Sequence, residues 1–416
     1  MKKNVWILNH YAGGMLFAHG GRHYSLAKYL KEAGYAPVVF CANAQHQKAA
    51  RFFDDDQLWR EEMAEEIRVP FLFVKARTYT GNGKQRLLNM LDFYCNVKKT
   101  AKEYAKTHGK PDVIYASSVH PLTLVAGIQL AKKFGVKCIC EVRDLWPESI
   151  VVYSTRFKKT NPLIRLLYLG EKWIYKKADQ LIFTMEGAYK YIQDQGWEKA
   201  IPSSKVHFIN NGVDLGIFDY NKEHHLVEDE DLDNPALFKV GYAGSIRKAN
   251  NVGLLLDVAK SVTDPRVRFL IWGSGDELPM LKQRLLDENI TNVIFKGQVE
   301  KNCIPCIISK LDVNYVDPFD EKIARYGISS NKLFEYFAAE KPILMSASGD
   351  YNPAANSDCA VVCQPNAESL LEGLEQILHM SGDAFAAMCA NAKAAGIDYN
   401  FSNLTEKLIE IIESPL

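Results

Sequence analysis

Short apolar segments alternate with amphipathic segments along almost the whole chain, and this alternation limits the possible folds more than any other feature. The apolar segments are continuous runs rich in Val, Ile and Phe, as expected for strands buried on both faces of a parallel sheet. The segments between them have helical spacing; within 22–33, Leu26, Leu30 and Ala33 share one face and Gly34 ends the helix. The pattern predicts an α/β fold. The expected strands are 4–10, 36–42, 69–75, 112–118, 137–143, 179–185 and 206–212, then 238–244, 267–273, 292–299, 312–318, 341–347 and 359–364.

The alternation stops near residue 213 and resumes near residue 237. The stretch between is polar and acidic and includes HHLVEDEDLDNP, a composition typical of a linker. A chain of 416 residues is also too long for one ordinary core. We therefore predict two doubly wound, Rossmann-like domains that face each other across a cleft. The expected parts are the domains 1–213 and 237–402, the linker 214–236, and a C-terminal helix 403–416 with Leu404, Leu408 and Ile411 at helical spacing.

Charge and composition exclude several classes of protein. Lys plus Arg and Asp plus Glu both number 50, and a protein that binds mainly nucleic-acid phosphates would normally be basic, so we expect no nucleic-acid partner. No apolar run approaches the ~20 residues of a membrane span. The run Val5–Leu8 is too short for the core of a signal peptide, and nine scattered cysteines fit a reducing compartment. We expect a cytoplasmic protein, with peripheral attachment to the inner face of the plasma membrane left open.

Ligands of parallel sheets bind beyond the carboxyl ends of the strands, so the residues there are candidates. In the first half these are the loop with Gly13 and Gly14, the histidine His120, and the charged segment 141–149, which contains Asp144. Paired glycines let a ligand approach the backbone, although they also suit a flexible loop. His120 is either a ligand-binding or a structural histidine. The segment 141–149 is either a buried Arg–carboxylate network or an acceptor pocket beside an aromatic wall.

In the second half, two turns combine features of phosphate sites. The turn Gly244-Ser245-Ile-Arg247-Lys248 joins small residues, two cations and a helix start. The turn 327–331 is rich in Ser and Gly and opens a helix, and Glu335 follows about one turn later. A carboxylate at this place can accept hydrogen bonds from two ribose hydroxyls. The alternative is a surface carboxylate, which the apolar neighbours of Glu335 disfavour.

Four segments together resemble a known family: EVRDLWPES (141–149), EKWIYKKADQLIFTMEG (171–187), INNGVD (209–214) and SSNKLFEYFAAEKPIL (329–344). They resemble the GT-B-fold retaining glycosyltransferases of family 4, and among these the bacterial O-antigen and capsule branch that includes the N-acetyl-L-fucosamine transferases. The resemblance implies transfer of a sugar from a nucleotide-sugar, most often UDP-linked, to a lipid-diphosphate-linked or oligosaccharide acceptor. It implies neither a metal nor a further cofactor.

The resemblance also implies residue roles. Lys248, helped by Arg247, would bind the diphosphate, Glu335 the ribose, and Val299 the base through its backbone. His120 would orient the sugar and Asp144 would position the acceptor. The expected nucleotide-sugar contacts are Gly13, Gly14, Gly244, Ser245, Val299, Ser330, Asn331, Lys332, Leu333 and Glu335.

The chain departs from the family at one place. Many members carry a glutamate eight positions before the one that matches Glu335, and this chain has Gly327 there. The sequence therefore shows no carboxylate nucleophile, and a front-side displacement is what the family implies. Two alternatives stay open, a nucleotide-sugar epimerase of the same fold and a non-catalytic nucleotide-sugar-binding subunit. A hydride-transfer enzyme is disfavoured, because no spaced glycine fingerprint follows any strand.

Residues 156–177 contain seven basic residues and one acid, Glu171, interleaved with Leu, Ile, Tyr and Trp. This pattern is typical of a helix that binds an anionic membrane surface. It fits a core helix with a solvated basic face equally well. Cys303 and Cys306 form a CxxC pair, but no second pair has matching spacing, so no metal site is predicted.

Overall fold

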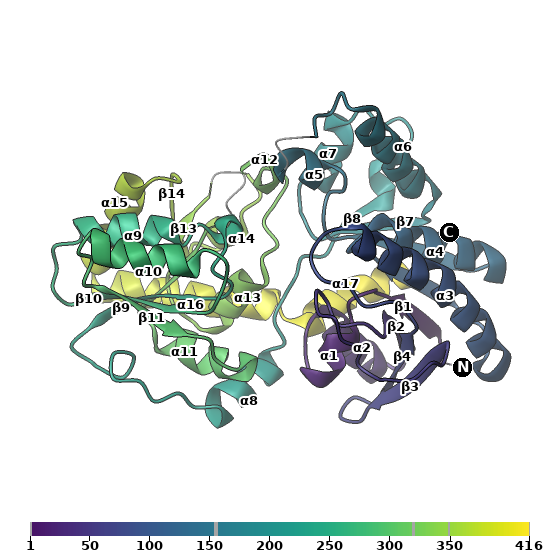
Figure 1. The fold of residues 1–416 in the computed structure, drawn as a ribbon, viewed down its shortest axis with the longest axis horizontal. Helices are drawn as coiled ribbons and strands as arrows, with labels where there is room; N and C mark the ends of the chain where they lie inside the picture. The colour runs from purple at the N-terminus through teal and green to yellow at the C-terminus, as the bar shows by residue number, and fades with distance from the viewer. Residues whose placement is uncertain (1, 154–156, 318–320, 348–349, 416) are drawn as a thin grey trace. The chain divides into compact units, whose positions relative to one another are not determined.

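The computed structural model describes residues 2–153, 157–317, 321–347 and 350–415 (Figure 1). The chain forms two compact units. Unit 1 consists of residues 1–210 together with 401–416, and unit 2 consists of residues 211–400. Each unit is an α/β structure built on its own sheet, as the alternating pattern predicts.

Unit 1 contains an eight-stranded sheet in the order β3-β4-β2-β1-β5-β6-β7-β8. All its neighbouring strands are parallel except β3, which runs antiparallel to β4. The strands are β1 (Asn4–Leu8), β2 (Ala36–Ala42), β3 (Trp59–Ala64), β4 (Val69–Val74), β5 (Val113–Ser117), β6 (Lys137–Val142), β7 (Gln180–Phe183) and β8 (Val206–Phe208). The helices are α1 (Gly13–Phe17), α2 (Arg22–Glu32), α3 (Lys84–His108), α4 (Pro121–Phe134), α5 (Glu148–Tyr153), α6 (Pro162–Lys177), α7 (Ala188–Asp194), η1 (Ser203–Lys205) and α17 (Phe401–Glu413).

Unit 2 contains a six-stranded parallel sheet in the order β11-β10-β9-β12-β13-β14. The strands are β9 (Phe238–Ala243), β10 (Val267–Trp272), β11 (Val293–Gly297), β12 (Val313–Val316), β13 (Ile343–Ser346) and β14 (Ala360–Cys363). The helices are α8 (Leu215–His224), η2 (Lys248–Asn250), α9 (Gly253–Ser261), α10 (Leu278–Asp287), η3 (Lys301–Cys303), α11 (Ile304–Lys310), α12 (Glu321–Ala324), α13 (Asn331–Ala338), α14 (Pro353–Asn356), α15 (Ala367–Leu378) and α16 (Gly382–Asp398).

Every expected strand is present, and the burial explains why the apolar runs are continuous. In β10, Phe269 and Ile271 pack into one core cluster of unit 2, while Leu270 and Trp272 pack into the cluster on the other face of the sheet. The pattern did not reveal β3. This edge strand reads Trp-Arg-Glu-Glu-Met-Ala and is largely exposed, so it lacks the apolar run that marks the buried strands.

The predicted linker 214–236 is part of unit 2. Its first half forms α8, and Phe218 and Leu232 are buried in the core of that unit. Three of its acids are not free linker charges, since Asp229 and Asp231 lie 2.7 and 2.5 Å from Lys296 and Asp233 lies 2.6 Å from Lys310. Part of the acidic composition that suggested a linker therefore pairs with lysines of unit 2.

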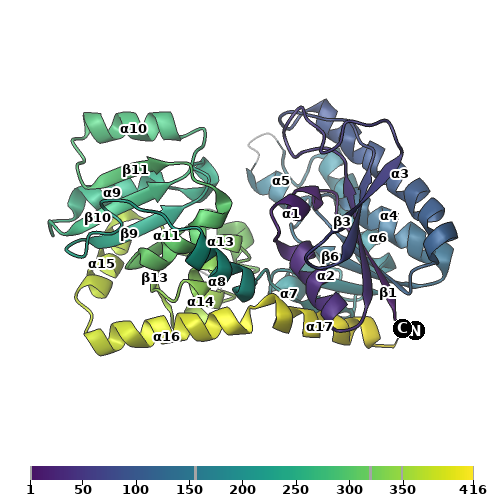
Figure 2. The same cartoon turned by 90° about the horizontal axis from the view of Figure 1, so that it is seen from below.

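The predicted C-terminal helix is α17, which begins two residues earlier than expected and belongs to unit 1. It lies against α2, and its Leu404, Leu408 and Ile411 are buried (Figure 2). The Lys137 ammonium group donates to the Ile411 and Ile412 carbonyls, both at 3.1 Å, and so satisfies the end of this helix.

Among the helices that the structure describes, none is both long enough and apolar enough to cross a membrane.

Candidate functional site

Three glycines stand at the carboxyl ends of neighbouring strands of unit 2. Gly244 follows β9, Gly273 follows β10 and Gly297 ends β11. The Gly244 N–H donates to the Trp272 carbonyl at 3.0 Å, and the Gly273 N–H donates to the Gly297 carbonyl at 2.7 Å. Gly273 has a φ of +138°, and a Cβ added there would lie 1.8 Å from the Gly244 carbonyl oxygen. The backbones of these turns pack directly against one another, which fixes the shape of the surface at the carboxyl ends of the strands.

We expect Gly273→Ala to lower the free energy of unfolding by more than about 1 kcal/mol, because alanine meets an unfavourable φ and a backbone oxygen. Gly297→Ala is the matched control, since Gly297 also has a positive φ, of +83°, but no atom lies within 4 Å of its added Cβ. Urea denaturation measures both losses. Equal losses would contradict a backbone clash at Gly273.

Lys332, in the first turn of α13, lies across the Gly244 turn. A Cβ on Gly244 would lie 2.5 Å from Lys332 Cε, so glycine is what leaves room for this side chain. The Nζ donates to the Tyr242 hydroxyl at 2.7 Å and to Asn250 Oδ1 at 3.0 Å. Desolvation lowers the pKa of Lys332 to about 8, although nearby carboxylates favour its charged form. An added anion would stabilise this ammonium group, so the turn suits a phosphate.

The predicted basic pair lies on the same turn but is exposed to solvent. Arg247 and Lys248 are both exposed, and Lys248 begins η2. Ser245 is held from the other side, since Asn250 Nδ2 donates to its carbonyl at 2.8 Å and to its Oγ at 2.9 Å. The structure therefore brings Lys332, rather than Lys248, into contact with the groups that hold the turn.

Glu335 follows Lys332 by about one turn on α13, and its side chain is half-buried. Desolvation raises its pKa, and Lys301 and Lys332 only partly offset this effect. No hydrogen-bond partner of this carboxylate is found among the described residues. Glu335 is thus not a fully exposed surface carboxylate, and both its oxygens are available as acceptors.

The other predicted contacts of unit 2 divide into two groups. Ser330 precedes α13 without capping it through its side chain, and Asn331 is exposed, so both lie at the open end of the helix. Val299 is half-buried and follows β11. Leu333 is different, since its side chain is fully buried in the core and its N–H donates to the Ser330 carbonyl at 3.1 Å. The Leu333 side chain faces inward, so a ligand contact of this residue would have to be made by its backbone, and that contact stays a prediction.

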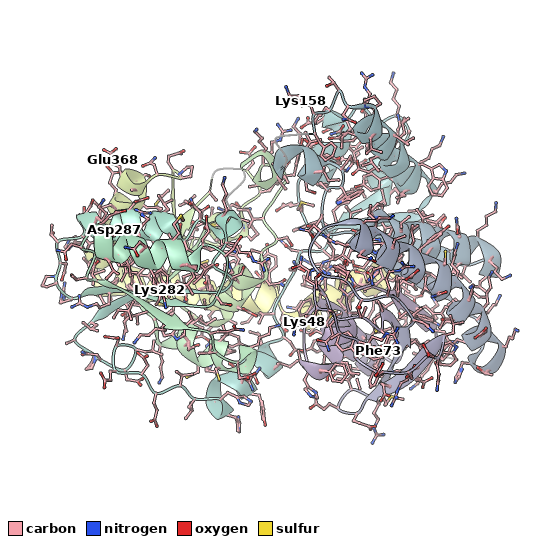
Figure 3. All side chains as sticks on the ribbon, in the orientation of Figure 1. Lys48, Phe73, Lys158, Lys282, Asp287 and Glu368 are labelled. Atoms are coloured by element: carbon pink, nitrogen blue, oxygen red, sulfur yellow. The ribbon has the colours of Figure 1, made fainter. Side chains whose placement is uncertain are left out.

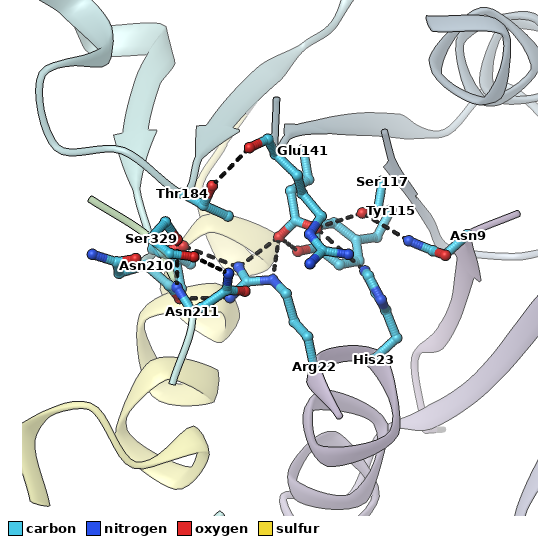
Figure 4. Close-up of polar contacts among 12 residues, drawn as sticks. Asn9, Arg22, His23, Tyr115, Ser117, Glu141, Thr184, Asn210, Asn211 and Ser329 are labelled. Atoms are coloured by element: carbon cyan, nitrogen blue, oxygen red, sulfur yellow. Dashed lines mark hydrogen bonds and ion pairs between the residues drawn. The ribbon is translucent and has the colours of Figure 1, made fainter. Parts of the chain in front are cut away.

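In unit 1, Glu141 at the end of β6 is the centre of a buried polar network (Figure 4). Its Oε1 accepts from Arg22 Nε at 2.7 Å and from the Tyr115 hydroxyl. Its Oε2 accepts from the Ser117 hydroxyl at 2.5 Å and lies 3.2 Å from His23 Nε2. Desolvation alone would raise the pKa of Glu141, but Arg22, His23 and Arg143 together outweigh it and hold the pKa well below its usual value.

Arg22 also holds the last residues of the segment 1–210 of unit 1. Its guanidinium donates to the Asn210 carbonyl at 2.5 Å and to the Ile209 carbonyl at 3.0 Å. The buried network expected around 141–149 is thus present, but its cation is Arg22 and not the adjacent Arg143.

A pocket in unit 1 is lined by His120, Asp144, Trp146 and Glu171, among other residues. His120 precedes α4, Asp144 and Trp146 follow β6, and Glu171 comes from α6. Asp144 is exposed to solvent at the pocket, and desolvation by the surrounding protein raises its pKa against the effect of Arg143. An aromatic ring beside hydrogen-bonding side chains suits a sugar, which has an apolar face and polar edges. The segment 141–149 therefore contributes to the buried network through Glu141 and to the pocket through Asp144 and Trp146, and the binding of an acceptor there stays a prediction.

His120 is buried and paired with a second histidine. Its Nε2 lies 2.8 Å from His10 Nδ1, whereas its Nδ1 has no hydrogen-bond partner among the described residues. Burial lowers the pKa of His120 to about 3 and that of His10 well below its usual value. Both rings are therefore neutral at pH 7, and His120 offers an unoccupied nitrogen to a ligand hydroxyl.

Glu171 is a buried carboxyl group without a cation in contact with it. Its Oε1 accepts from the Tyr175 hydroxyl at 2.7 Å, and its Oε2 accepts from the Tyr191 hydroxyl at 2.9 Å. Desolvation raises its pKa to about 8, although the two tyrosine hydroxyls favour the charged form. Glu171 is thus largely protonated near pH 7.

This pKa predicts a pH-dependent stability. Between its ordinary value of 4.5 and about 8, the folded state binds a proton that the unfolded state has lost, so stability falls as the pH rises. We expect Glu171→Gln to remove this contribution, and its stability relative to the wild type to rise by up to about 1.4 kcal/mol per pH unit. Urea denaturation of both proteins at several pH values in this window tests the expectation. Parallel pH profiles would contradict it.

The two N-terminal glycines do not behave alike. Gly13 is buried at the start of α1, and a Cβ there would lie 2.7 Å from Phe52 and 3.0 Å from Phe73. Gly14 is exposed, with only Phe52 within 4 Å of its added Cβ. Packing against aromatic rings explains the glycine at 13 without a ligand, whereas Gly14 stays available to one.

His10, Arg22 and Glu171 are not among the residues predicted from the sequence to form the site. His10 and Arg22 come from the loop and helix after β1, where only the glycines were considered. Glu171 had a signal of its own, as the one acid among seven basic residues over 156–177.

Two family models match the chain, one in each half. Glycosyltransferase Family 4 matches residues 22–216, and Glycosyl transferases group 1 matches residues 238–380. A protein of Bacillus subtilis (strain 168) that carries the name teichuronic acid biosynthesis glycosyltransferase TuaH is 23% identical over 210 residues. That match covers 50% of this chain and 49% of the relative, so the chain spans about half the length of this curated relative.

Solved structures of similar fold cover nearly the whole chain. An E. coli trehalose-6-phosphate structure bound with UDP-2-fluoro glucose has a TM-score of 0.73 at 12% identity and covers 100% of both chains. Sucrose-phosphate synthase from Thermosynechococcus elongatus has a TM-score of 0.70 at 16% identity and covers 99% of this chain and 98% of that one. Anabaena HepE in complex with UDP and glucose has a TM-score of 0.67 at 15% identity, over 99% and 100% of the two chains.

The two α/β sheets, the two family matches and the solved structures of similar fold all indicate the same fold and class of enzyme. The chain is a glycosyltransferase of the GT-B fold, in which residues 22–216 match the Glycosyltransferase Family 4 model and residues 238–380 match the Glycosyl transferases group 1 model.

Proposed function

We propose that this glycosyltransferase moves a sugar from a UDP-sugar to a lipid-diphosphate-linked or oligosaccharide acceptor in the synthesis of a bacterial surface polysaccharide such as O-antigen, capsule or exopolysaccharide. The observation that carries the proposal is the cluster of Lys332, the Gly244 turn and Glu335 at the carboxyl ends of the strands of unit 2. The HepE and E. coli neighbours contain UDP or a UDP-sugar, which supports uracil as the base. The name of TuaH supports a polysaccharide product.

Within this proposal, unit 2 binds the donor. Lys332 and the first amides of α13 neutralise the diphosphate, with Arg247 and Lys248 as exposed cations near it. The Glu335 carboxylate accepts from the two ribose hydroxyls, and the backbone near Val299 meets the base. No metal is needed in this scheme, because the cations of the chain stabilise the leaving group.

Unit 1 supplies the residues that act on the sugars. His120 offers its free Nδ1 to a hydroxyl of the donor sugar, and Asp144 positions the acceptor hydroxyl. The pocket beside Trp146 receives part of the acceptor. The N-acetyl-L-fucosamine transferase branch remains our proposal for the closest activity, on the segments 141–149 and 329–344.

We propose transfer with retention of the anomeric configuration. The position eight residues before Glu335 is Gly327, which is buried and has a φ of +126°, so a side chain there would be strained. Without a carboxylate nucleophile, the acceptor oxygen attacks the anomeric carbon from the side of the leaving group. The bond from that carbon to the UDP oxygen breaks, and the leaving phosphate takes the acceptor proton.

The test is a transfer assay with the full chain, labelled UDP-, GDP- and TDP-sugars, and polyprenyl-diphosphate-linked and soluble oligosaccharide acceptors. We expect transfer from a UDP-sugar, with the anomeric configuration of the product, read by NMR, equal to that of the donor. Turnover of GDP- or TDP-sugars alone would overturn the base, and an inverted product would overturn retention. Isomerised free donor in the absence of acceptor would point to an epimerase instead.

A further inference from the structure

Helix α6 of unit 1 carries a ridge of exposed apolar side chains. Leu163, Leu166, Leu169 and Trp173 have exposed fractions of 55%, 63%, 64% and 43%. Their spacing of three and four residues places them along one side of the helix. The other side of α6 is buried, through residues that include Ile164, Glu171, Ile174 and Tyr175. No other helix in the described part of the chain exposes more than two large apolar side chains.

Basic residues flank this ridge. Arg165, Lys176 and Lys177 are exposed on α6, and Lys172 is half-buried with its Nζ 6.0 Å from the centre of the Trp197 ring. The one acid of the helix, Glu171, is turned into the core, so the exposed side of α6 carries no carboxylate.

Lys158 extends the basic charge beyond the helix and lies at the outer margin of unit 1 near α5 and α6 (Figure 3). Lys159 does not add to it, because it pairs with Glu148 at 2.9 Å. Arg156, one of the seven basic residues of the predicted segment, lies outside the described residues.

We propose that α6 is a membrane-docking helix that lies flat on an anionic lipid bilayer. The ridge of Leu163, Leu166, Leu169 and Trp173 enters the boundary between headgroups and acyl chains, and the flanking cations meet lipid phosphates. Charge complementarity favours lipid over a protein partner, since the basic rim is uninterrupted by acids and the apolar ridge is a single helix wide. This surface does not depend on the proposed transfer. A membrane-docking helix would also favour a lipid-linked acceptor over a soluble one. Only this preference for the acceptor rests on the proposed function.

The experiment is co-sedimentation of the full chain with vesicles of phosphatidylglycerol and phosphatidylethanolamine, and with vesicles of phosphatidylcholine. Leu166→Ser/Leu169→Ser removes the centre of the ridge, and Lys176→Glu/Lys177→Glu reverses part of the rim. Met280→Ser/Leu286→Ser on α10 is the matched control, because these side chains are 54% and 76% exposed in unit 2. Circular dichroism and UDP binding report whether each variant is folded and whether the donor site is intact.

We expect the wild type and the α10 control to bind anionic vesicles at least about tenfold more tightly than neutral ones, and both α6 variants to lose this preference. Equal binding of wild type and α6 variants, or no binding by the wild type, would overturn the proposal. A dimer of the wild type that dissociates in Leu166→Ser/Leu169→Ser would identify the ridge as a protein interface and overturn it as well. Vesicle binding without transfer would leave docking intact and refute the proposed function.

Discussion

Replacement of Glu141 by alanine is expected to lower the free energy of unfolding by about 3–5 kcal/mol, the loss typical of a broken buried ion pair. The Arg22 side chain is only 2% exposed and Glu141 is completely buried, so the variant leaves the guanidinium group buried without its carboxylate. The variant also leaves the hydroxyls of Tyr115 and Ser117 without the acceptor they share. Most of the loss therefore comes from the partners left behind, rather than from the net value of the ion pair.

Two further variants separate these effects. Glu141→Gln keeps the shape and one oxygen acceptor, so we expect a smaller loss than for alanine. Glu186→Ala is the control, because Glu186 is exposed and such substitutions usually change stability by less than about 0.5 kcal/mol. Urea denaturation gives the three values. A loss below about 1 kcal/mol for Glu141→Ala would show that the network is not held by its charge.

The second large effect is expected on catalysis. Lys332→Met should lower kcat/KM for the UDP-sugar by about 10²–10³-fold, as when one preorganised group that stabilises a leaving anion is removed. Methionine keeps much of the side-chain volume over Gly244 but cannot donate to Tyr242 and Asn250 or neutralise a phosphate. The exposed Arg247 and Lys248 should matter less individually, because solvent screens their charge.

Lys282→Met is the control for Lys332→Met. Lys282 is an exposed lysine of α10 in the same unit (Figure 3), and it makes none of the hydrogen bonds by which Lys332 contacts the Gly244 turn, so this variant should keep the wild-type rate. Steady-state transfer kinetics measure the effect, and thermal unfolding shows whether Lys332→Met is still folded. A folded Lys332→Met protein with less than a tenfold loss would contradict the assignment of Lys332 to the diphosphate.

The sequence predicts the sheets well because a strand that is buried on both faces consists of consecutive apolar residues, which can be recognised locally. A strand such as 36–42 is a continuous apolar run, and its limits agree with β2. β3 has no such apolar run, since it is a charged edge strand. Residues 214–236 were misjudged for a related reason: local acidity suggests a linker, but whether acids meet lysines such as Lys296 depends on distant parts of the chain.

For the site as well, local residue types could be predicted from the sequence, whereas contacts between distant residues could not. The turns at 244 and 330 could be identified from local residue types. That Lys332 crosses Gly244, 88 positions earlier, could not, because the contact is made by the fold. Likewise the partner of Glu141 is Arg22, although Arg143 stands two residues away. That the Leu333 side chain faces the core could not be predicted either, because a family motif does not tell which side of a short helix is buried.

The central claim is that unit 2 holds a uridine diphosphate with Glu335 on the ribose. Calorimetric titration with UDP and with 2′-deoxy-UDP tests it most directly, in the wild type, in Glu335→Gln and in the exposed control Glu368→Gln. A hydrogen bond to a charged acceptor contributes about 1.5–3 kcal/mol, so the wild type and the control should prefer UDP by about tenfold or more. Glu335→Gln should lose most of this preference while still binding both nucleotides. An undiminished preference in Glu335→Gln, or no binding of UDP by the wild type, would contradict the account.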